Sequence, residues 1–220
     1  MCRGGVQQME FCKPAEIEKE SMRIISEEIS ARGITLPEDI APVVKRVIHT
    51  TADFDYLDTL FFSPGAVRKG IEALKKGKVI VTDTNMALAG ISKKSLVLLG
   101  GKAVCFMADE AVAAEAREQG ITRAVVSVRH AAELYPECIY AVGNAPTALF
   151  ELGEQIRKGM RPSLIVALPV GFVNVVEAKE MIIKICTEEN IPIIASRGRK
   201  GGSNVAAAIC NALIYKAIDI

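Results

Sequence analysis

The sequence predicts an α/β fold, a doubly wound, mostly parallel sheet with helices on both faces. Two observations support this prediction. Short β-branched runs alternate with longer amphipathic segments over most of the chain. The short runs are uniformly apolar, which is typical of strands buried on both faces. The 220 residues are half apolar and suffice for one domain with a full core. We expect a tail over residues 1–13 and a single domain over 14–220, which begins with helices.

Two helices are expected before the sheet. The first spans Pro14–Arg32, where isoleucines recur at helical spacing. Gly33 follows and is a typical residue for ending a helix. The second begins near Pro37 and ends near His49–Ala52, just before an acidic stretch. The N-terminal part of the domain is therefore expected to be helical, and the sheet to follow it.

The rest of the chain alternates between predicted strands and predicted helices. The strands are expected at Val79–Thr82, Ala103–Met107, Cys138–Val142, Leu164–Leu168 and Ile191–Ala195. The helices are expected at Pro64–Lys76, Asp109–Gln119, Thr122–Leu134, Pro146–Lys158, Val175–Glu189 and Ser203–Ala217. Strands separated by helices favour parallel pairing, because each crossover returns the chain to the same edge of the sheet.

Composition excludes several classes of protein. The 27 basic and 26 acidic residues nearly cancel, which argues against a nucleic-acid partner bound by bulk charge. No apolar run reaches the ~20 residues that span a bilayer, so no membrane is expected. Six scattered cysteines and no export signal indicate the cytoplasm. The two histidines and the cysteines show no metal-ligand spacing, so no protein-bound metal is expected.

Four loops are candidate ligand-binding segments, because ligands bind beyond the carboxyl ends of strands in open α/β sheets. They are Asp83–Met86, Gly143–Thr147, Pro169–Asn174 and Arg197–Ser203. The two middle loops carry almost no ionisable groups. They suit backbone hydrogen bonding and shape recognition, or simply tight packing where a strand turns into a helix.

The last of these loops is the most informative. Arg197, Arg199 and Lys200 lie among three glycines directly before a predicted helix. Glycines let backbone N–H groups approach a ligand, and a helix N-terminus favours negative charge. Arginine can also bind a carboxylate through two parallel hydrogen bonds. The loop therefore predicts an anion site for phosphate or carboxylate, with a solvated basic turn as the alternative.

His49 is the candidate proton donor. It lies off the apolar stripe of its helix and near the helix C-terminus, where the helix dipole favours imidazolium. Asp53 and Asp55 follow and act in the same direction. A histidine in this setting suits proton transfer near neutral pH, and an ordinary surface histidine is the alternative. His130 lies beside Arg129 in the middle of a helix, and we interpret it as a surface residue.

Seven segments form a pattern when they are taken together and in order. They are Ile17–Glu27 with Ser21, Arg46–His49, Asp83-x-x-Met86-x-x-x-Gly90, Thr122-Arg123, G-N-A-P-T-A-L-F at Gly143–Phe150, P-V-G-F-V at Pro169–Val173 with Glu177-Ala178-Lys179, and R-G-R-K-G-G-S at Arg197–Ser203. This pattern extends over about Pro14–Ala217, essentially the whole chain, and resembles the precorrin-8X methylmutase family.

The resemblance implies a flavodoxin-like homodimer with active sites near the subunit interface. It implies an isomerase of cobalamin biosynthesis that moves a methyl group from ring carbon 11 to ring carbon 12. The substrate is precorrin-8X or cobalt-precorrin-8, and the product is hydrogenobyrinate or cobyrinate. No cofactor is expected, and cobalt enters only as part of the substrate. The family histidine that protonates the macrocycle corresponds to His49.

The resemblance also indicates which residues contact this tetrapyrrole polycarboxylate. The basic loop is expected to hold its peripheral carboxylates. The expected substrate-binding residues are Ser21, Asp83, Met86, Arg123, Gly143, Asn144, Thr147, Gly171, Arg197, Arg199, Lys200, Gly201 and Ser203.

The alternative function is a doubly wound nucleotide- or phosphate-binding oxidoreductase or binding module, since the basic loop suits phosphate. However, no G-x-G-x-x-G follows Val79–Thr82, and the chain has no Walker loop. A structural assembly factor is a third class, but such a protein would need neither His49 nor the basic loop.

Overall fold

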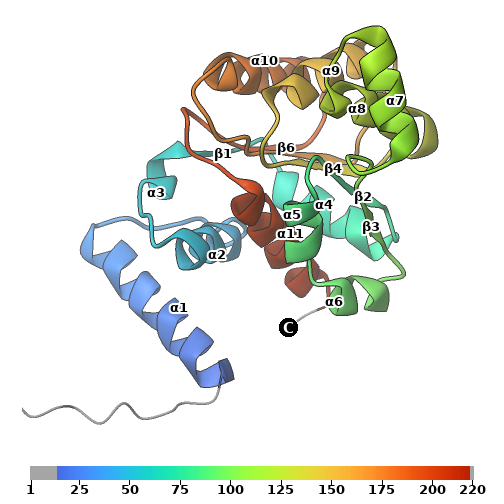
Figure 1. Cartoon of the computed structure of the whole chain (residues 1–220). Coiled ribbons are helices and arrows are strands. Elements are labelled where there is room, and N and C mark those ends of the chain that lie inside the picture. Colours follow the sequence, from blue (N-terminus) through green and yellow to red (C-terminus); the bar gives the residue numbers. More distant parts are fainter. Residues whose placement is uncertain (1–13, 219–220) are drawn as a thin grey trace, which may run out of the picture. The chain divides into compact units, whose positions relative to one another are not determined.

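The computed structural model describes residues 14–218, in two compact units (Figure 1). The first unit runs to Thr35 and contains helix α1 (Pro14–Ala31), which confirms the first predicted helix. The second unit runs from Leu36 to the C-terminus. The single domain expected over 14–220 stays a prediction. The expected tail, 1–13, lies outside the described residues.

Six strands of the second unit form one sheet with the order β1-β6-β5-β4-β2-β3. They are β1 (Leu60–Phe62), β2 (Ile80–Thr82), β3 (Ala103–Val104), β4 (Ile139–Val142), β5 (Leu164–Ala167) and β6 (Ile193–Ser196). All neighbours pair in parallel except β1, which is antiparallel to β6. When β2 is counted as the first strand, the parallel strands have the flavodoxin-like order 2-1-3-4-5. The predicted fold class is confirmed.

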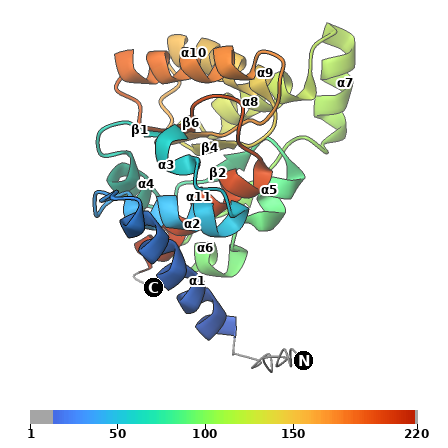
Figure 2. The same ribbon diagram turned by 90° about the vertical axis from the view of Figure 1, so that its left-hand side faces the viewer.

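Helices cover both faces of this sheet (Figures 1 and 2). They are α2 (Ala41–Thr51), α3 (Tyr56–Thr59), α4 (Ala66–Lys75), α5 (Asn85–Gly90), α6 (Lys93–Leu98), α7 (Glu110–Gln119), α8 (Arg123–Leu134), α9 (Pro146–Arg157), α10 (Val175–Glu188) and α11 (Ser203–Ala217). On one face α11 packs against α2, α4 and α5. On the other, α9 lies between α8 and α10, and α7 packs on α8.

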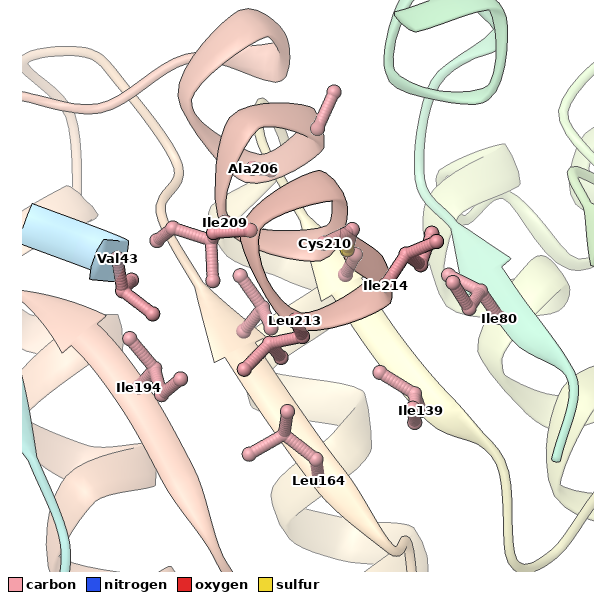
Figure 3. Packing of buried hydrophobic residues seen from close by; sticks show 14 of the residues in the cluster. Val43, Ile80, Ile139, Leu164, Ile194, Ala206, Ile209, Cys210, Leu213 and Ile214 are labelled. Carbon is pink, nitrogen blue, oxygen red and sulfur yellow. The ribbon is translucent and has the colours of Figure 1, made fainter. Parts of the chain in front are cut away.

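The core on the α11 face is built from aliphatic side chains, as Figure 3 shows. Ile209, Leu213 and Ile214 of α11 pack with Ile139 of β4 and Leu164 of β5, and all five are almost completely buried. Burial of this apolar surface is the main stabilising contribution, at ~25 cal/mol per Å². It also fixes the start of α11 relative to the carboxyl ends of the central strands, where the site residues lie.

Several element boundaries differ from the predicted ones. The helix expected from Pro37 begins at Ala41. The strand expected over Ala103–Met107 ends at Val104, because it is an edge strand and the chain turns where the N–H of Asp109 donates to the carbonyl of Phe106. Strand β1 and helices α3, α5 and α6 were not predicted. They span three to six residues each, too few to establish a periodicity.

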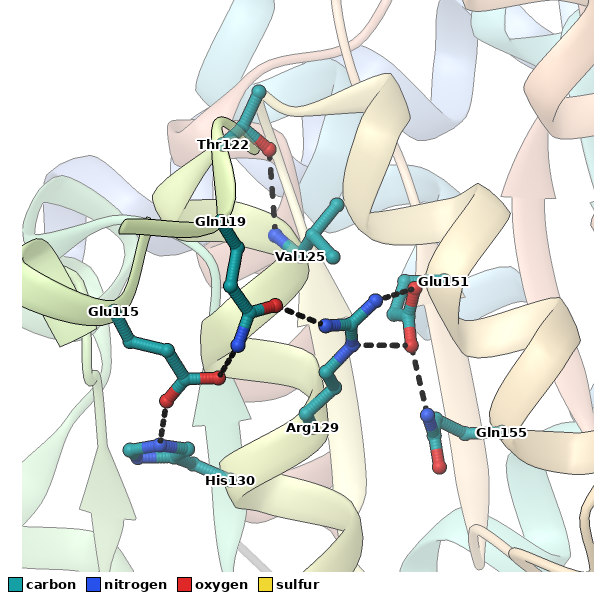
Figure 4. Close-up of polar contacts among 8 residues, drawn as sticks. All are labelled: Glu115, Gln119, Thr122, Val125, Arg129, His130, Glu151 and Gln155. Atoms are coloured by element: carbon teal, nitrogen blue, oxygen red, sulfur yellow. Dashed lines mark hydrogen bonds and ion pairs between the residues drawn. The ribbon is translucent and has the colours of Figure 1, made fainter. Parts of the chain in front are cut away.

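A polar network joins α7, α8 and α9 (Figure 4). Nε of Arg129 donates to Oε1 of Glu151 over 3.0 Å, and Gln155 donates to the same oxygen over 2.7 Å. The interpretation of His130 as a surface residue was wrong. Because α7 covers this side of α8, His130 is half-buried, and its Nε2 lies 3.1 Å from Oε2 of Glu115. His130 therefore belongs to the packing of α7 on α8.

Candidate active site

The strand order reverses between β2 and β4. At this point the carboxylate of Asp83, directly after β2, forms hydrogen bonds to the loop after β4. Its Oδ1 accepts a hydrogen bond from the N–H of Gly143, and its Oδ2 accepts from Asn144 and Ala145, each over 2.8 Å. Only 1% of Asp83 is exposed. Burial raises its pKa, although the three N–H donors favour the ionised form. Asp83 was expected to contact substrate, but its carboxylate is enclosed and organises the Gly143–Ala145 backbone.

The loop after β6 packs directly on these two loops. Oγ1 of Thr84 lies 2.8 Å from Oγ of Ser203, and it also accepts the N–H of Ala87 at the start of α5. A Cβ on Gly143 would lie only 2.5 Å from Cα of Ser203, so this approach requires glycine. The loops after β2, β4 and β6 therefore meet, as the topology predicts.

The loops after β5 and β6 also form one structure. A Cβ on Gly201 would lie 2.1 Å from the carbonyl oxygen of Leu168. The N–H of Gly202 donates to this same oxygen over 2.8 Å, and the N–H of Gly171 donates to the carbonyl of Arg199 over 3.3 Å. Gly171 and Gly201 thus act through their backbones, which permit the close approach that side chains would prevent.

A buried lysine of α10, Lys179, forms hydrogen bonds to the basic loop, Arg197–Ser203. The side chain of Lys179 is fully buried, and Nζ donates to the carbonyls of Gly198 (3.0 Å) and Lys200 (2.7 Å) and to Oγ of Ser196 (3.0 Å). Burial of the ammonium lowers the pKa of Lys179 to about 8. Sequence reasoning assigned no role to Lys179. Its burial could have been predicted from its spacing from Val175 and Ile182, which places Lys179 on the apolar stripe of α10.

The arginines near the site have different partners. NH1 of Arg197 lies 2.6 Å from Oε2 of Glu180. The guanidinium of Arg199 instead lies over the ring of Phe172, 5.5 Å from its centroid. Within residues 14–218, neither Arg199 nor Arg123 forms an ion pair. These two exposed guanidiniums are therefore the cations most available to an anionic ligand.

Lys200 connects the basic loop to the segment that follows α2. Its Nζ lies 2.5 Å from Oδ2 of Asp53 and 2.6 Å from Oδ2 of Asp55. The two carboxylates raise the pKa of Lys200 well above its usual range, and Lys200 lowers the pKa of Asp53. Sequence reasoning related these aspartates to His49 but did not foresee their contact with Lys200. The charge of Lys200 is thus already balanced within the protein.

His49 lies in the last turn of α2 and is exposed, while Val43, Val47 and Ile48 of this helix are buried. The helix stops just beyond it, at Ala52, whose φ is 53°. Its predicted position off the apolar stripe and near the helix C-terminus is confirmed. Since Lys200 holds the segment that begins at Asp53, the end of α2 is tied to the basic loop.

Thr147 and Arg123 belong to adjacent helix starts. Oγ1 of Thr122 donates to Oγ1 of Thr147 over 3.1 Å. The same oxygen accepts the N–H of Val125, which caps α8, as Figure 4 shows. Arg123 is the first residue of α8. Asn144 is exposed on the neighbouring loop after β4. The structure therefore brings Arg123, Asn144 and Thr147 to the same side of the sheet.

Exposed apolar side chains belong to the same group of loops. Met86 is 71% exposed, Phe172 83% and Val173 77%. Phe172 and Val173 are neighbours in the loop after β5, and large apolar side chains exposed close together often mark a binding surface. Ser21, the remaining predicted position, lies on α1 in the first unit.

The described residues contain neither a metal-binding cluster nor a helix that could span a membrane. No group of three His, Cys, Asp or Glu side chains among them is placed to hold a metal ion. The absence of a resident metal stays a prediction. None of the described helices is long and apolar enough to cross a membrane.

Comparison with known proteins identifies the family. A family model described as precorrin-8X methylmutase matches residues 16–216. The chain belongs to this family. A cobalt-precorrin-8 methylmutase of Leptospira interrogans is 44% identical, with 90% of this chain and 91% of the relative aligned. A cobalt-precorrin-8 methylmutase of Salmonella typhimurium is 48% identical over 79% of this chain and 80% of its own length.

A solved structure supports the same assignment. The precorrin-8X methylmutase of Thermus thermophilus matches with a TM-score of 0.83 and 41% identity, over 92% of this chain and 98% of that one. The resemblance found in the sequence motifs is therefore confirmed over nearly the whole chain. The methylmutase family match extends across both compact units.

Proposed function

We propose that this chain catalyses the methyl shift from ring carbon 11 to ring carbon 12 of precorrin-8X or cobalt-precorrin-8, with His49 as the proton donor. Family membership over residues 16–216 gives the enzyme class, a methylmutase of cobalamin biosynthesis. The observation that supports the site is the ion pair of Lys200 with Asp53, which ties the end of the His49 helix to the basic loop.

The chemistry needs a fixed acid and charge partners. The bond from the methyl group to carbon 11 breaks and a bond to carbon 12 forms, so the composition and the oxidation level are unchanged. A proton from His49 makes the conjugated ring system electron-poor, which lowers the barrier to migration, and the proton returns to His49 once the methyl group has moved. No hydride carrier or external methyl donor is required, and we propose a cofactor-free reaction.

Substrate binding is assigned to the loops at the carboxyl ends of the strands. Arg199 and Arg123, which lack carboxylate partners among the described residues, would bind the acid arms through charge-assisted hydrogen bonds. Met86 and Phe172 would contact the apolar faces of the macrocycle. Ser21, Asn144 and the other predicted positions remain part of this proposal.

The nucleotide- or phosphate-binding alternative is less consistent with the site. In the flavodoxin-like order, such ligands bind at the switch point, which here lies between β2 and β4. The N–H groups of Gly143, Asn144 and Ala145 at this point already donate to Asp83. A buried carboxylate thus occupies donors that a phosphate would need.

Several expectations about partners and location belong to the proposal. We propose a homodimer, and exposed apolar side chains such as Val97 and Leu98 are compatible with a subunit contact. Nucleic acid and membranes are not proposed as partners. Cytoplasmic location is supported by the free thiols of Cys105, Cys138, Cys186 and Cys210.

The test is turnover of the dialysed protein. Protein treated with chelator is incubated separately with the metal-free and the cobalt-containing substrate, and the absorption spectrum is followed. Conversion without additions supports the proposal, and the two rates show which substrate is preferred. Recovery of activity only with NAD, S-adenosylmethionine or a divalent metal would overturn the cofactor-free mechanism. Nucleotide binding without tetrapyrrole binding would favour the alternative.

A further inference from the structure

We propose that Lys179 is a positioning residue, which directs the backbone N–H groups of Arg199 and Gly201 toward the acid arms of the tetrapyrrole. This inference rests on the proposed function. Lys179 does not touch the ligand in this assignment, since its side chain is fully buried. It acts through the two carbonyl groups, of Gly198 and Lys200, that accept hydrogen bonds from its ammonium.

Peptide geometry gives the direction of the N–H groups. The carbonyl of Gly198 shares a peptide unit with the N–H of Arg199, and the carbonyl of Lys200 shares one with the N–H of Gly201. The described residues contain no cis peptide bond. In a trans peptide the C=O and N–H point in opposite directions. With both carbonyls turned to Nζ, the N–H groups of Arg199 and Gly201 point away from the buried ammonium.

These donors are available to a ligand. Within residues 14–218, the N–H groups of Arg199 and Gly201 donate to no protein acceptor, whereas the flanking N–H groups of Arg197 and Gly202 donate to Thr59 and Leu168. The ammonium also polarises the two peptide units, because linked hydrogen bonds strengthen one another. A carboxylate that contacts either donor would be bound through a strengthened hydrogen bond.

The ionic environment of Lys179 points to a role in binding an anion. Its acceptors are two carbonyls and the Ser196 hydroxyl, and all three are neutral. The neighbouring carboxylate on α10, Glu180, is paired with Arg197. A buried charge without a counter-ion is costly to stability. A polycarboxylate bound on the other side of the loop would supply the missing negative charge.

The same arrangement makes affinity depend on pH. Burial lowers the pKa of Lys179 to about 8, so the ammonium is present below that pH and is lost as the pH rises through it. The other charged groups around the loop are Glu180 with Arg197, Arg199, and Asp53 and Asp55 with Lys200. Carboxylates titrate well below pH 7 and arginine well above pH 10. The carboxylates around Lys200 raise its pKa further.

The experiment titrates the full-length protein with the coloured product between pH 7 and pH 9.5. Wild type should bind most tightly below about pH 8 and lose affinity above it. Lys179→Met, which replaces the ammonium with an unbranched apolar side chain of similar size, should bind about tenfold more weakly at pH 7, equivalent to ~1.4 kcal/mol, and show a flat profile. Lys184→Met is the matched control, because Lys184 lies on the same helix, is exposed and pairs with Glu188. It should behave as wild type.

Each outcome decides a different question. If wild type binds no tetrapyrrole at any pH, the proposed function fails. If wild type binds but its affinity is unchanged up to pH 9.5, or if Lys179→Met retains the wild-type profile, the role of Lys179 is overturned. The wild-type profile decides alone if Lys179→Met does not fold. Amide ¹⁵N shifts of Arg199 and Gly201 on product binding, seen in wild type and reduced in Lys179→Met, would locate the contact.

Discussion

Nζ of Lys200 lies 2.5 Å from Oδ2 of Asp53, across a separation of 147 residues in the chain. This contact joins the loop after β6 to the segment that follows the His49 helix. Both side chains retain some exposure, so the pair contributes little to global stability. Its importance lies in placing the proposed acid relative to the proposed carboxylate site, because small errors in the position of a catalytic group slow a reaction strongly.

The first prediction concerns this contact. Lys200→Met should lower kcat, because it releases the segment that follows the His49 helix. Asp53→Asn should lower kcat less, because Asp55 still pairs with Lys200. The double variant should be no slower than Lys200→Met alone, since Lys200→Met already removes the ion pair with Asp53 together with the one to Asp55. Steady-state kinetics of the three variants test this. Fully additive effects on kcat would show that Lys200 and Asp53 act independently, as they would if Lys200 bound a substrate carboxylate directly.

The second prediction concerns the acid. His49→Ala should lose turnover and still bind the coloured product, because the proton matters mainly in the transition state. His130→Ala is the control, since His130 is engaged with Glu115 between α7 and α8. It should turn over at the wild-type rate. Loss of activity in His130→Ala with full activity in His49→Ala would reverse the assignment.

The positions of the loops could be predicted from the sequence, but the atoms that meet there could not. Uniformly apolar runs such as Leu164–Ala167 indicated parallel strands, and parallel strands place their following loops at one edge. Asp83 was correctly placed after a strand. Its hydrogen bonds to residues 60 positions or more away depend on the close approach of two loops, which no local pattern encodes.

The roles of the basic residues show the same limit. Arg197, Arg199 and Lys200 look equivalent in the sequence, and all three were expected to hold carboxylates. Their partners come from α10, the loop after β5 and the segment after α2, so tertiary contacts distinguish them. Strand β1 was missed for a related reason. Its three residues are held by pairing with β6, and they carry no alternation of their own.

The third prediction compares the two arginines of the loop. Arg199→Ala should weaken tetrapyrrole binding by roughly tenfold to a hundredfold, as expected for a lost charge-assisted hydrogen bond. Arg197→Ala should have a smaller effect, because Arg197 is already paired with Glu180. The difference should be larger at low salt, since salt screens exposed charges. Product titrations at two ionic strengths measure both effects. Equal affinity of Arg199→Ala and wild type at low salt would place the acid arms elsewhere.

The last prediction concerns Asp83 and separates folding from binding. In Asp83→Asn, one oxygen can still accept the N–H groups of Asn144 and Ala145, but the amide NH₂ must then face the N–H of Gly143. A buried donor left without an acceptor costs about 1–3 kcal/mol, and the free energy of unfolding should fall by that amount. Chemical denaturation measures it. Asp83 is 1% exposed and holds the loop from inside the protein. The substitution should therefore change product affinity only indirectly, through a shift of the Gly143–Ala145 backbone. Thr84→Val is a comparison at the neighbouring position, since it removes the contacts of Thr84 with Ser203 and with the N–H of Ala87 while the three N–H bonds of Asp83 remain. Unchanged stability of Asp83→Asn with a large loss of affinity would show instead that Asp83 contacts the substrate directly.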